Sequence, residues 1–418
     1  MNPISEIITI GDELLIGQTI DTNSAWMGER LSMIGLPVRR ITSISDEPAE
    51  IRSALDDSLK RADLILITGG LGPTNDDRTK KTLGEFFCSR FILNQVVLSD
   101  IERLWSKRNA PVVGVNRDQA LVPDNCRVIR NFNGTAPGMW FERDGKIVIS
   151  MPGVPFEMKG MMETTILPAL QEHFKAPAII YKTIMTTGVG ESALALKIKA
   201  WEDTLPKGFS LAYLPSPGIV KLRITGKGPD TGAVIKRIDR LLDGLIELIP
   251  DWVYGYDEET LEQVMGALLL KNKFTLATAE SCTGGTIASL ITSVPGSSAW
   301  YRGSIVAYAN EIKEKLLDIP KETIELHGAV SREVVERMAS SARVKLEADY
   351  AIAVSGIAGP DGGTPEKPVG TVWIAVSGPK ESESKLFALG DHRERNIMRA
   401  SLAALNMLRV RVLKDTTG

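Results

Sequence analysis

Residues 64–77 of the chain are LILITGGLGPTNDD. The four apolar residues that open this stretch predict a strand that is buried on both faces. The glycines and the proline that follow end the strand. Glycines also let the backbone approach a phosphate closely, and the carboxylates at the end of the stretch are oxygen donors suited to a hard divalent cation. A strand that runs directly into such a loop is typical of α/β sheets, which bind ligands beyond the carboxyl ends of their strands.

The segments on both sides of this stretch continue an alternation of strands and helices. We expect further strands at 7–10, 37–44 and 147–150, and helices at 22–33 and from Pro48 onward. Asp46 precedes the second of these helices, and we expect it to cap that helix. Such alternation favours a parallel sheet with helices on both faces. Residues 1–172 are therefore predicted to form a three-layer α/β domain.

The pattern changes after residue 172. Residues 173–256 predict a small α+β module, with strands at 182–187 and 218–225 and helices at 192–201 and 232–248. Residues 257–418 begin with an apolar helical stripe. They continue with strands at 274–277, 304–308, 350–354 and 371–376 and a helix at 396–413. This third region is predicted to be a second α/β domain.

Composition excludes several classes of function. The 418 residues carry a net charge of −3, so no basic surface for nucleic acid is expected. The three cysteines and three histidines are scattered and show no zinc-site spacing: Cys88, Cys126, Cys282, His173, His327 and His392. No apolar run approaches the roughly 18 residues that span a bilayer. The N-terminus lacks a basic leader segment, so we expect a cytoplasmic protein without membrane contact.

The third region contains the octapeptide TAESCTGG at 278–285, between a predicted strand and a predicted helix. Ser281 in this turn could act as a nucleophile if a base and oxyanion donors lie nearby. No histidine is placed for the role of base, so a lysine with a lowered pKa is the other common solution. A carboxylate that activates water, with Glu280 first in line, is an alternative. A purely structural role is also open, in which Ser281 caps the helix and Cys282 fills the core.

Four further segments accompany this octapeptide, namely YANEIK at 308–313, GAVS at 328–331, SGIAGPDGG at 355–363 and KPVGTV at 367–372. Together they resemble the C-terminal domain of the CinA family, the nicotinamide-nucleotide amidohydrolases, over about residues 261–413. The resemblance implies that Ser281 is the nucleophile and Lys313 its base. It also implies that the phosphate partner is Arg393 or Arg395, because GDHR at 390–393 has one residue more than the family's Gly-Asp-Arg. The expected substrate-binding residues are Thr283, Gly284, Gly285, Tyr308, Asn310, Ser331, Gly356 and Arg393.

The N-terminal loops resemble the molybdopterin-binding domain of molybdenum-cofactor biosynthesis proteins, in its CinA form, over about residues 4–170. That resemblance implies a metal-dependent ADP-ribose pyrophosphatase. It implies a divalent cation of the Mg²⁺ or Co²⁺ type, with Asp46 and Asp77 as ligands. If the resemblance is set aside, Asp12 and Asp46 could be helix caps only. The expected site residues are Gly11, Asp12, Glu13, Asp46, Gly69, Gly70, Gly72, Thr74, Asp76 and Asp77.

The middle module resembles the family's KH-like segment. A nucleic-acid-binding KH domain needs a Gly-x-x-Gly clamp, whereas this stretch offers only GVG at 188–190 and GKG at 226–228. We therefore expect a connector or a dimerisation element, and a homodimer without direct nucleic-acid contact. The predicted function is the hydrolysis of nicotinamide mononucleotide to nicotinate mononucleotide and ammonia, with a second activity on ADP-ribose. The alternatives are pterin binding, or a competence or DNA-damage accessory role through partner contacts.

Overall fold

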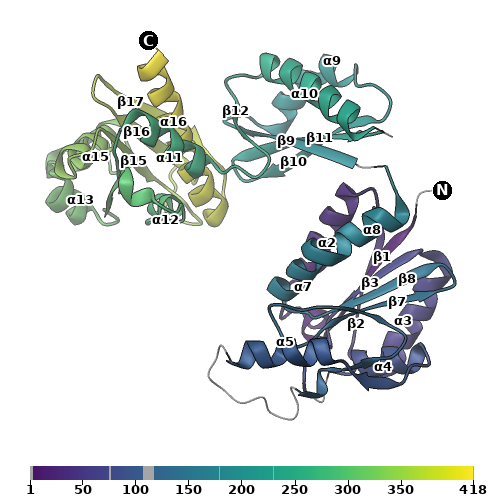
Figure 1. The fold of residues 1–418 in the computed structure, drawn as a ribbon. Helices are drawn as coiled ribbons and strands as arrows, with labels where there is room; N and C mark the ends of the chain where they lie inside the picture. The colour runs from purple at the N-terminus through teal and green to yellow at the C-terminus, as the bar shows by residue number, and fades with distance from the viewer. Residues whose placement is uncertain (1–2, 75–76, 107–116, 178, 229, 418) are drawn as a thin grey trace. The chain divides into compact units, whose positions relative to one another are not determined.

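The computed structural model describes residues 3–74, 77–106, 117–177, 179–228 and 230–417 (Figure 1). The chain divides into two compact units. One comprises residues 1–180 with 227–235, and the other comprises residues 181–226 with 236–418. Among the described residues, no helix is both long and apolar enough to cross a membrane.

The N-terminal domain is built on a six-stranded sheet of order β2-β1-β3-β8-β7-β6. Its first four strands in this order are parallel to one another, and β7 is antiparallel to both of its neighbours, β8 and β6. The strands are β1 (Ser5–Ile10), β2 (Val38–Ile44), β3 (Leu64–Thr68), β6 (Arg127–Ile129), β7 (Gly138–Arg143) and β8 (Lys146–Met151). The parallel strands end at one edge, which brings the loops after β1, β2, β3 and β8 together.

Helices cover both faces of this sheet, because alternate side chains of each buried strand point to opposite faces. Leu64 and Leu66 of β3 pack with α2 (Thr22–Met33), α7 (Pro155–Met161) and α8 (Leu167–Phe174). Ile65 and Ile67 pack with α3 (Pro48–Arg61) and α4 (Thr79–Phe86). The domain is completed by α1 (Asp12–Leu15), β4 (Phe91–Leu93), α5 (Gln95–Ser106), β5 (Leu121–Pro123) and a π-helical turn (Met162–Ile166).

The middle module is a four-stranded sheet of order β10-β11-β9-β12 with two helices. Its elements are β9 (Ile179–Thr187), α9 (Glu191–Glu202), β10 (Phe209–Ser216), β11 (Ile219–Lys227), α10 (Thr231–Leu248) and β12 (Val253–Tyr256). β11 alternates strictly between more and less buried residues up to Gly226, as expected for a strand with one face on a core.

The C-terminal domain is a five-stranded sheet of order β14-β13-β15-β16-β17. β14, β13 and β15 are parallel to one another, and β16 is antiparallel to both of its neighbours, β15 and β17. The strands are β13 (Leu276–Glu280), β14 (Tyr301–Val306), β15 (Tyr350–Gly356), β16 (Thr371–Ser377) and β17 (Ser382–Ala388). The carboxyl ends of β13 and β14 therefore meet at one edge.

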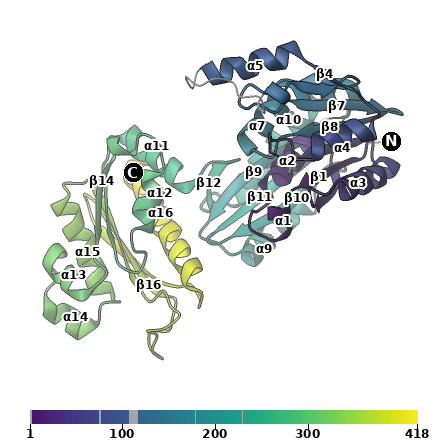
Figure 2. The same cartoon turned by 90° about the horizontal axis from the view of Figure 1, so that it is seen from below.

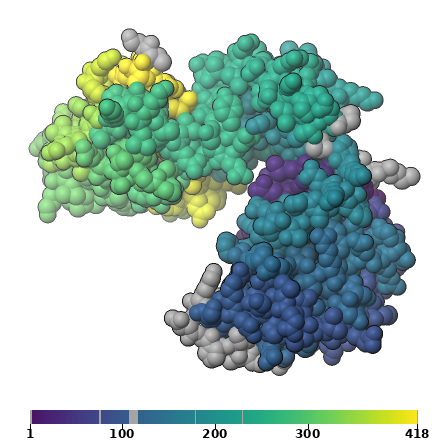
Figure 3. Space-filling model, viewed as in Figure 1, coloured from purple at the N-terminus to yellow at the C-terminus, as the bar shows by residue number. Residues whose placement is uncertain are grey.

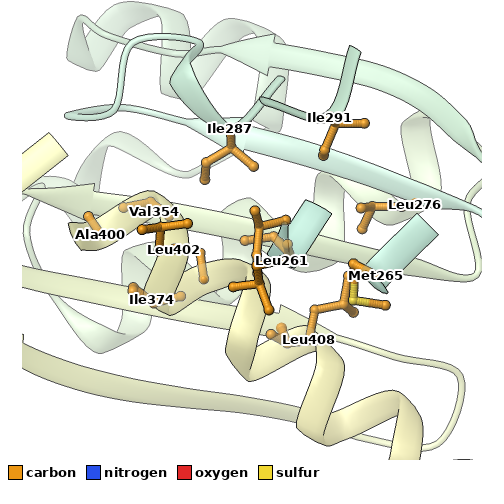
Figure 4. Close-up of a cluster of buried hydrophobic side chains, with 14 of the residues drawn as sticks. Leu261, Met265, Leu276, Ile287, Ile291, Val354, Ile374, Ala400, Leu402 and Leu408 are labelled. Atoms are coloured by element: carbon orange, nitrogen blue, oxygen red, sulfur yellow. The ribbon is translucent and has the colours of Figure 1, made fainter. Parts of the chain in front are cut away.

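Two helical layers enclose this sheet (Figure 2). On one face lie α11 (Leu261–Asn272), α12 (Thr286–Thr292) and α16 (Arg393–Thr417). Their side chains point toward one another and toward the sheet in Figure 4. On the other face lie α13 (Asn310–Leu317), α14 (Lys321–His327) and α15 (Arg332–Lys345). Figure 3 shows segments distant in sequence, the green α11 and the yellow α16, side by side on the surface.

The predicted fold class is confirmed, and so are most predicted elements. The helix expected at 22–33 matches α2. The side chain of Asp21 accepts the Ser24 N–H at 2.9 Å and caps the start of this helix. The predicted cap of α3 is wrong. Glu47, not Asp46, is the residue before this helix, and no side chain caps it. Asp12 is likewise the first residue of α1 and not its cap.

Candidate active sites

Ser281 directly follows β13 and lies at the carboxyl edge of the C-terminal sheet. Its N–H donates to Val354 O of β15 at 3.0 Å, which continues the strand pairing by one residue. Its carbonyl oxygen accepts the Gly284 N–H at 3.1 Å and starts a tight turn. The residue is 7 % exposed, and its hydroxyl makes no hydrogen bond to any residue that the structure describes. The hydroxyl of Ser281 is therefore free to react.

Two backbone donors beside this hydroxyl are also unengaged. Within the described part of the chain, the N–H groups of Cys282 and Thr283 donate to no oxygen. Consecutive N–H groups next to a nucleophile are the usual donors of an oxyanion hole. The turn therefore offers a nucleophile and two donors in three adjacent residues.

Lys313 lies on α13, in the loop-helix segment that follows β14. The Ala307 N–H donates to Glu280 O at 2.8 Å, which ties this segment to the end of β13. The Lys313 side chain is 1 % exposed, and its Nζ donates to Tyr308 O at 3.2 Å. Burial lowers the pKa of Lys313, although the charges of Cys282 and Glu311 oppose this shift. A lysine with a lowered pKa can accept a proton near neutral pH.

The pKa of the Cys282 thiol, next to Ser281, is affected by the charge of Lys313. Burial raises the pKa of Cys282 to about 12, and the positive charges of Lys313 and Arg393 act against that rise. Lys313 and Arg393 therefore lie within electrostatic range of the residue next to Ser281. A thiol with so high a pKa is not a thiolate at neutral pH, so Cys282 is not the nucleophile.

Tyr308 and Arg393 form a pair at the exposed side of this site. Arg393 donates to the Tyr308 hydroxyl at 3.0 Å and to Gly359 O at 2.7 Å. Both residues are exposed, so a ligand phosphate could reach the guanidinium. Arg395 is exposed and makes no such contact among the described residues. Of the two arginines named from the sequence, the geometry favours Arg393.

Of the other residues expected at this site, Ser331 and Gly356 have local structural roles. The Ser331 hydroxyl donates to Gly328 O and accepts the Val334 N–H, which caps α15. A Cβ at Gly356 would come within 2.6 Å of Val372, so close packing requires glycine there. Asn310 is exposed at the start of α13. The Thr283 hydroxyl is buried and has no partner among the described residues.

Glu280 has a role that the sequence did not indicate. Its buried carboxylate accepts three backbone N–H groups, from Gly285 at 3.0 Å, Ile287 at 3.1 Å and Ala288 at 2.8 Å. The glycines of this loop were expected to approach a ligand anion. In the structure the N–H of Gly285 and the first turn of α12 bind the protein's own carboxylate.

In the N-terminal domain the loops after β1 and β3 place the carboxylates of Asp12, Glu13 and Asp77 within electrostatic range of Asp46, which follows β2. Burial raises the pKa of Asp46, a hydrogen bond from the backbone of Asp12 opposes this shift, and the charges of Asp12, Glu13 and Asp77 add to it. Asp77 also holds its own loop, because its carboxylate accepts the N–H and the hydroxyl of Thr74. Asp76 lies outside the described residues.

The glycines of this site are required by space and by conformation. Gly70 has φ +64°, and a Cβ there would come within 2.1 Å of the Thr79 hydroxyl and 3.2 Å of Asp46. Gly69 has φ +113°, and a Cβ there would come within 2.0 Å of Ile10 O. A Cβ at Gly72 would collide with Asp77, and one at Gly11 with Glu13. Glycine at these positions leaves room for the carboxylates of Asp46, Asp77 and Glu13.

Asn23 also lies at this site, although it is not among the expected site residues. Its Nδ2 donates to Gly153 O at 2.7 Å and so joins α2 to the loop after β8. It also lines a cavity of about 110 Å³ together with Glu13 and Thr68. Its place in the first turn of a helix, two residues after the capping Asp21, is the available signal. A larger cavity of about 910 Å³ lies in the second unit and contains none of the predicted site residues.

Comparison with known proteins agrees with this arrangement. Three family models match the chain: a probable molybdopterin binding domain at 6–172, a damage-inducible protein CinA KH domain at 181–255 and a CinA C-terminal domain at 258–412. A CinA-like protein of Cytophaga hutchinsonii is 48 % identical over 411 residues, 98 % of either chain. The chain belongs to the CinA family.

Other CinA relatives carry similar descriptions. A putative competence-damage inducible protein of Halothermothrix orenii is 41 % identical and covers 94 % of either chain. Among solved structures, a competence/damage inducible protein from Agrobacterium tumefaciens is 37 % identical over 36 % of this chain and 92 % of its own, with a TM-score of 0.36.

Proposed function

We propose that the C-terminal domain hydrolyses the carboxamide of nicotinamide mononucleotide. The observation that carries the proposal is the combination of an unengaged Ser281 hydroxyl with a buried Lys313 at the same edge of the sheet. A serine needs a base to become a nucleophile, and a neutral lysine supplies one. Burial lowers the pKa of Lys313 and so favours this neutral form.

The reaction would proceed through an acyl-enzyme. The Ser281 hydroxyl attacks the carboxamide carbon, and Lys313 accepts its proton. The N–H groups of Cys282 and Thr283 donate to the oxyanion that forms. Lys313 then gives the proton to the leaving nitrogen, and ammonia departs. Water attacks the ester, Lys313 accepts a proton from that water and returns it to Ser281, and nicotinate mononucleotide leaves.

Arg393 is the proposed partner of the substrate's phosphate. Its guanidinium already makes two hydrogen bonds, so the head group is oriented before the substrate arrives. Arginine binds phosphate through paired N–H donors. Free nicotinamide lacks the phosphate and should be a poor substrate for this site.

Release of ammonia from nicotinamide mononucleotide tests this function. The full-length chain should release one ammonia for each nicotinate mononucleotide formed, and Ser281→Ala should not. Ser289→Ala, a change in the same domain outside the turn, is the matched control and should keep full turnover. Absence of ammonia from the wild-type chain would refute the proposal and leave pterin binding or a partner-mediated accessory role.

For the N-terminal domain we propose a divalent-cation-dependent hydrolysis of the pyrophosphate of ADP-ribose. The supporting observation is the group of carboxylates around Asp46. Within the described residues, no three or more Asp, Glu, His or Cys side chains are arranged to hold a metal by themselves. Mg²⁺ is commonly bound by one or two carboxylates together with substrate phosphates. Asp46 and Asp77 fit a cation of this kind, which would neutralise charge on the phosphates.

Turnover of ADP-ribose to AMP and ribose 5-phosphate, with and without Mg²⁺ or Co²⁺, tests the second activity. Asp77→Asn should abolish it while ammonia release from nicotinamide mononucleotide continues. Thr74→Ala is the matched variant, since it removes only the hydroxyl that Asp77 binds. If both variants lose the same activity at saturating metal, Asp77 shapes the loop and does not hold the cation.

A further inference from the structure

Glu280 is a fully buried carboxylate that no step of the proposed reaction uses. It is the last residue of β13 and lies next to Ser281. Its Oε2 accepts the N–H groups of Gly285 and Ile287, and its Oε1 accepts that of Ala288. Ser304 on β14 adds a weaker contact to Oε1 at 3.4 Å. An ionised carboxylate is stabilised in the interior by several hydrogen bonds of this kind.

The backbone of the turn is shaped to make these contacts. Gly284 has φ +60° and Gly285 has φ +99°, two consecutive left-handed residues. No atom lies within 4 Å of a Cβ built at Gly284, and a Cβ at Gly285 would meet only Val306 at 3.7 Å. Conformation and not space therefore demands glycine here. The two residues turn the chain so that the N–H groups of 285, 287 and 288 converge on Glu280.

The same contacts close a ring of backbone around the nucleophile. Residues 281–285 connect the end of β13 to the start of α12, and Glu280 joins these two ends. The N–H groups that it binds are those of the last residue of the turn and of the first turn of α12, whereas those of Cys282 and Thr283 have no oxygen partner among the described residues. The carboxylate thus separates the donors that hold the turn from the donors that can serve an oxyanion.

We propose that Glu280 is a positioning residue of the amide hydrolysis, whose carboxylate holds the 281–285 turn so that the Ser281 hydroxyl and the N–H groups of Cys282 and Thr283 face the substrate. This inference rests on the proposed function of the C-terminal site. It assigns Glu280 neither proton transfer nor substrate contact. Both carboxylate oxygens already accept hydrogen bonds, Oε2 from Gly285 and Ile287 and Oε1 from Ala288 and Ser304.

Glu280→Gln tests this role, because its NH₂ group would face backbone donors in place of an acceptor. We expect kcat for ammonia release to fall about 100-fold, the usual cost of a displaced reacting group, with KM changed by less than about twofold. Glu280→Asp keeps the charge and should retain more activity than Glu280→Gln. If Glu280→Gln fails to fold, this Asp variant carries the test, and wild-type kcat in it overturns the proposal.

Asp349→Asn is the matched control. Asp349 accepts the N–H and hydroxyl of Thr275 at 2.8 Å each, just before the opposite end of β13. It therefore makes a similar carboxylate–backbone contact far from the turn. The control should lower the unfolding temperature without lowering kcat. An equal loss of kcat in both variants would show that Glu280 acts through general stability, and would overturn the positioning role.

The pH profile separates positioning from base catalysis. In Glu280→Gln the acid limb of kcat should keep its wild-type midpoint, since Lys313 supplies that limb, and only the plateau should fall. Loss of the limb would make Glu280 the base and overturn the inference. A fluorophosphonate probe that labels serine gives a readout independent of the amide. Slower labelling of Ser281 in Glu280→Gln supports positioning even if nicotinamide mononucleotide is not the substrate, and equal labelling rates refute it.

Discussion

Lys313 is nearly inaccessible to solvent, and its charge state governs the proposed chemistry. The neutral form is the base, so turnover should fall as the pH drops through the lowered pKa of Lys313. Lys313→Arg keeps a positive charge that cannot be lost and should be as inactive as Ser281→Ala, a loss of about 10⁴-fold. The exposed Lys315 on the same helix is the control, and Lys315→Arg should keep wild-type turnover. A tenth of wild-type activity in Lys313→Arg would exclude lysine as the base.

The same lowered pKa affects stability. Between the pKa of Lys313 in the folded chain and that of an ordinary lysine, the unfolded chain binds a proton that the folded chain lacks. The free energy of unfolding should therefore rise with pH across this window. Lys313→Met should reduce that rise, which urea titrations at several pH values would measure.

For Asp46, the ionised form that would bind a cation is the form that lowers the stability of the folded domain. Burial and three neighbouring carboxylates raise its pKa, so its ionised form destabilises the folded domain at neutral pH. Asp46→Asn should raise the unfolding temperature at pH 7 and abolish turnover of ADP-ribose. The gain should vanish below the pKa of an unfolded aspartate, about 3.9, where both forms are protonated.

Asp57 provides a control for Asp46. It is exposed, and a hydrogen bond from Lys60 lowers its pKa. Asp57→Asn should therefore not stabilise the domain and should leave activity unchanged. Unfolding temperatures that change in the same direction in both variants would contradict the electrostatic explanation.

At the scale of single elements, the parallel strands of the βα units and the helices beside them could be predicted, and the antiparallel strands at the sheet edges were mostly missed. β3 is an uninterrupted apolar run, and α11 begins with Thr260 and Gln263 in a reciprocal capping box. β17 is mostly exposed and lacks the alternation that identifies a half-buried strand. The antiparallel β6 and β7 were missed as well, because the sequence was interpreted through its parallel βα units.

The role of Glu280 could not be derived from the octapeptide for a similar reason. A carboxylate before a nucleophile is equally compatible with a base, a ligand or a cap. The choice depends on where the N–H groups of residues 285–288 point, which is set by two left-handed glycines. Ser281 directly follows β13, and Lys313 lies on the helix after the adjacent parallel strand β14. The pairing of these two residues was implied by the family resemblance and not by sequence spacing.

Helix α16 joins the C-terminal domain to the middle module. The buried guanidinium of Arg409 donates to Val253 O at 3.2 Å and Asp251 O at 3.4 Å, and Met185 and Tyr254 share the core of the C-terminal domain. A fragment 258–418 would expose these contacts. It should release ammonia but unfold at a lower temperature than a fragment 181–418, as differential scanning fluorimetry would show. Equal unfolding temperatures would mean that the shared core adds no stability.

At the scale of the whole molecule, the clusters of buried apolar residues divide the chain into fewer parts than its three large sheets do. The N-terminal clusters contain residues of that domain alone, whereas one cluster includes side chains from both the middle module and the C-terminal domain. The expected homodimer, the cation and both substrates stay predictions, because each depends on groups outside a single chain.

This division of the cores has a calorimetric consequence. Heating should produce two separate peaks of excess heat capacity, since cooperative unfolding follows a shared core and not the number of sheets. Nicotinamide mononucleotide, added to Ser281→Ala so that it is not consumed, should move one peak upward by mass action and leave the other in place. ADP-ribose, tested with Asp77→Asn and Ca²⁺, should move only the other peak. Each ligand would then raise the unfolding temperature of one unit of the protein and leave that of the other unchanged.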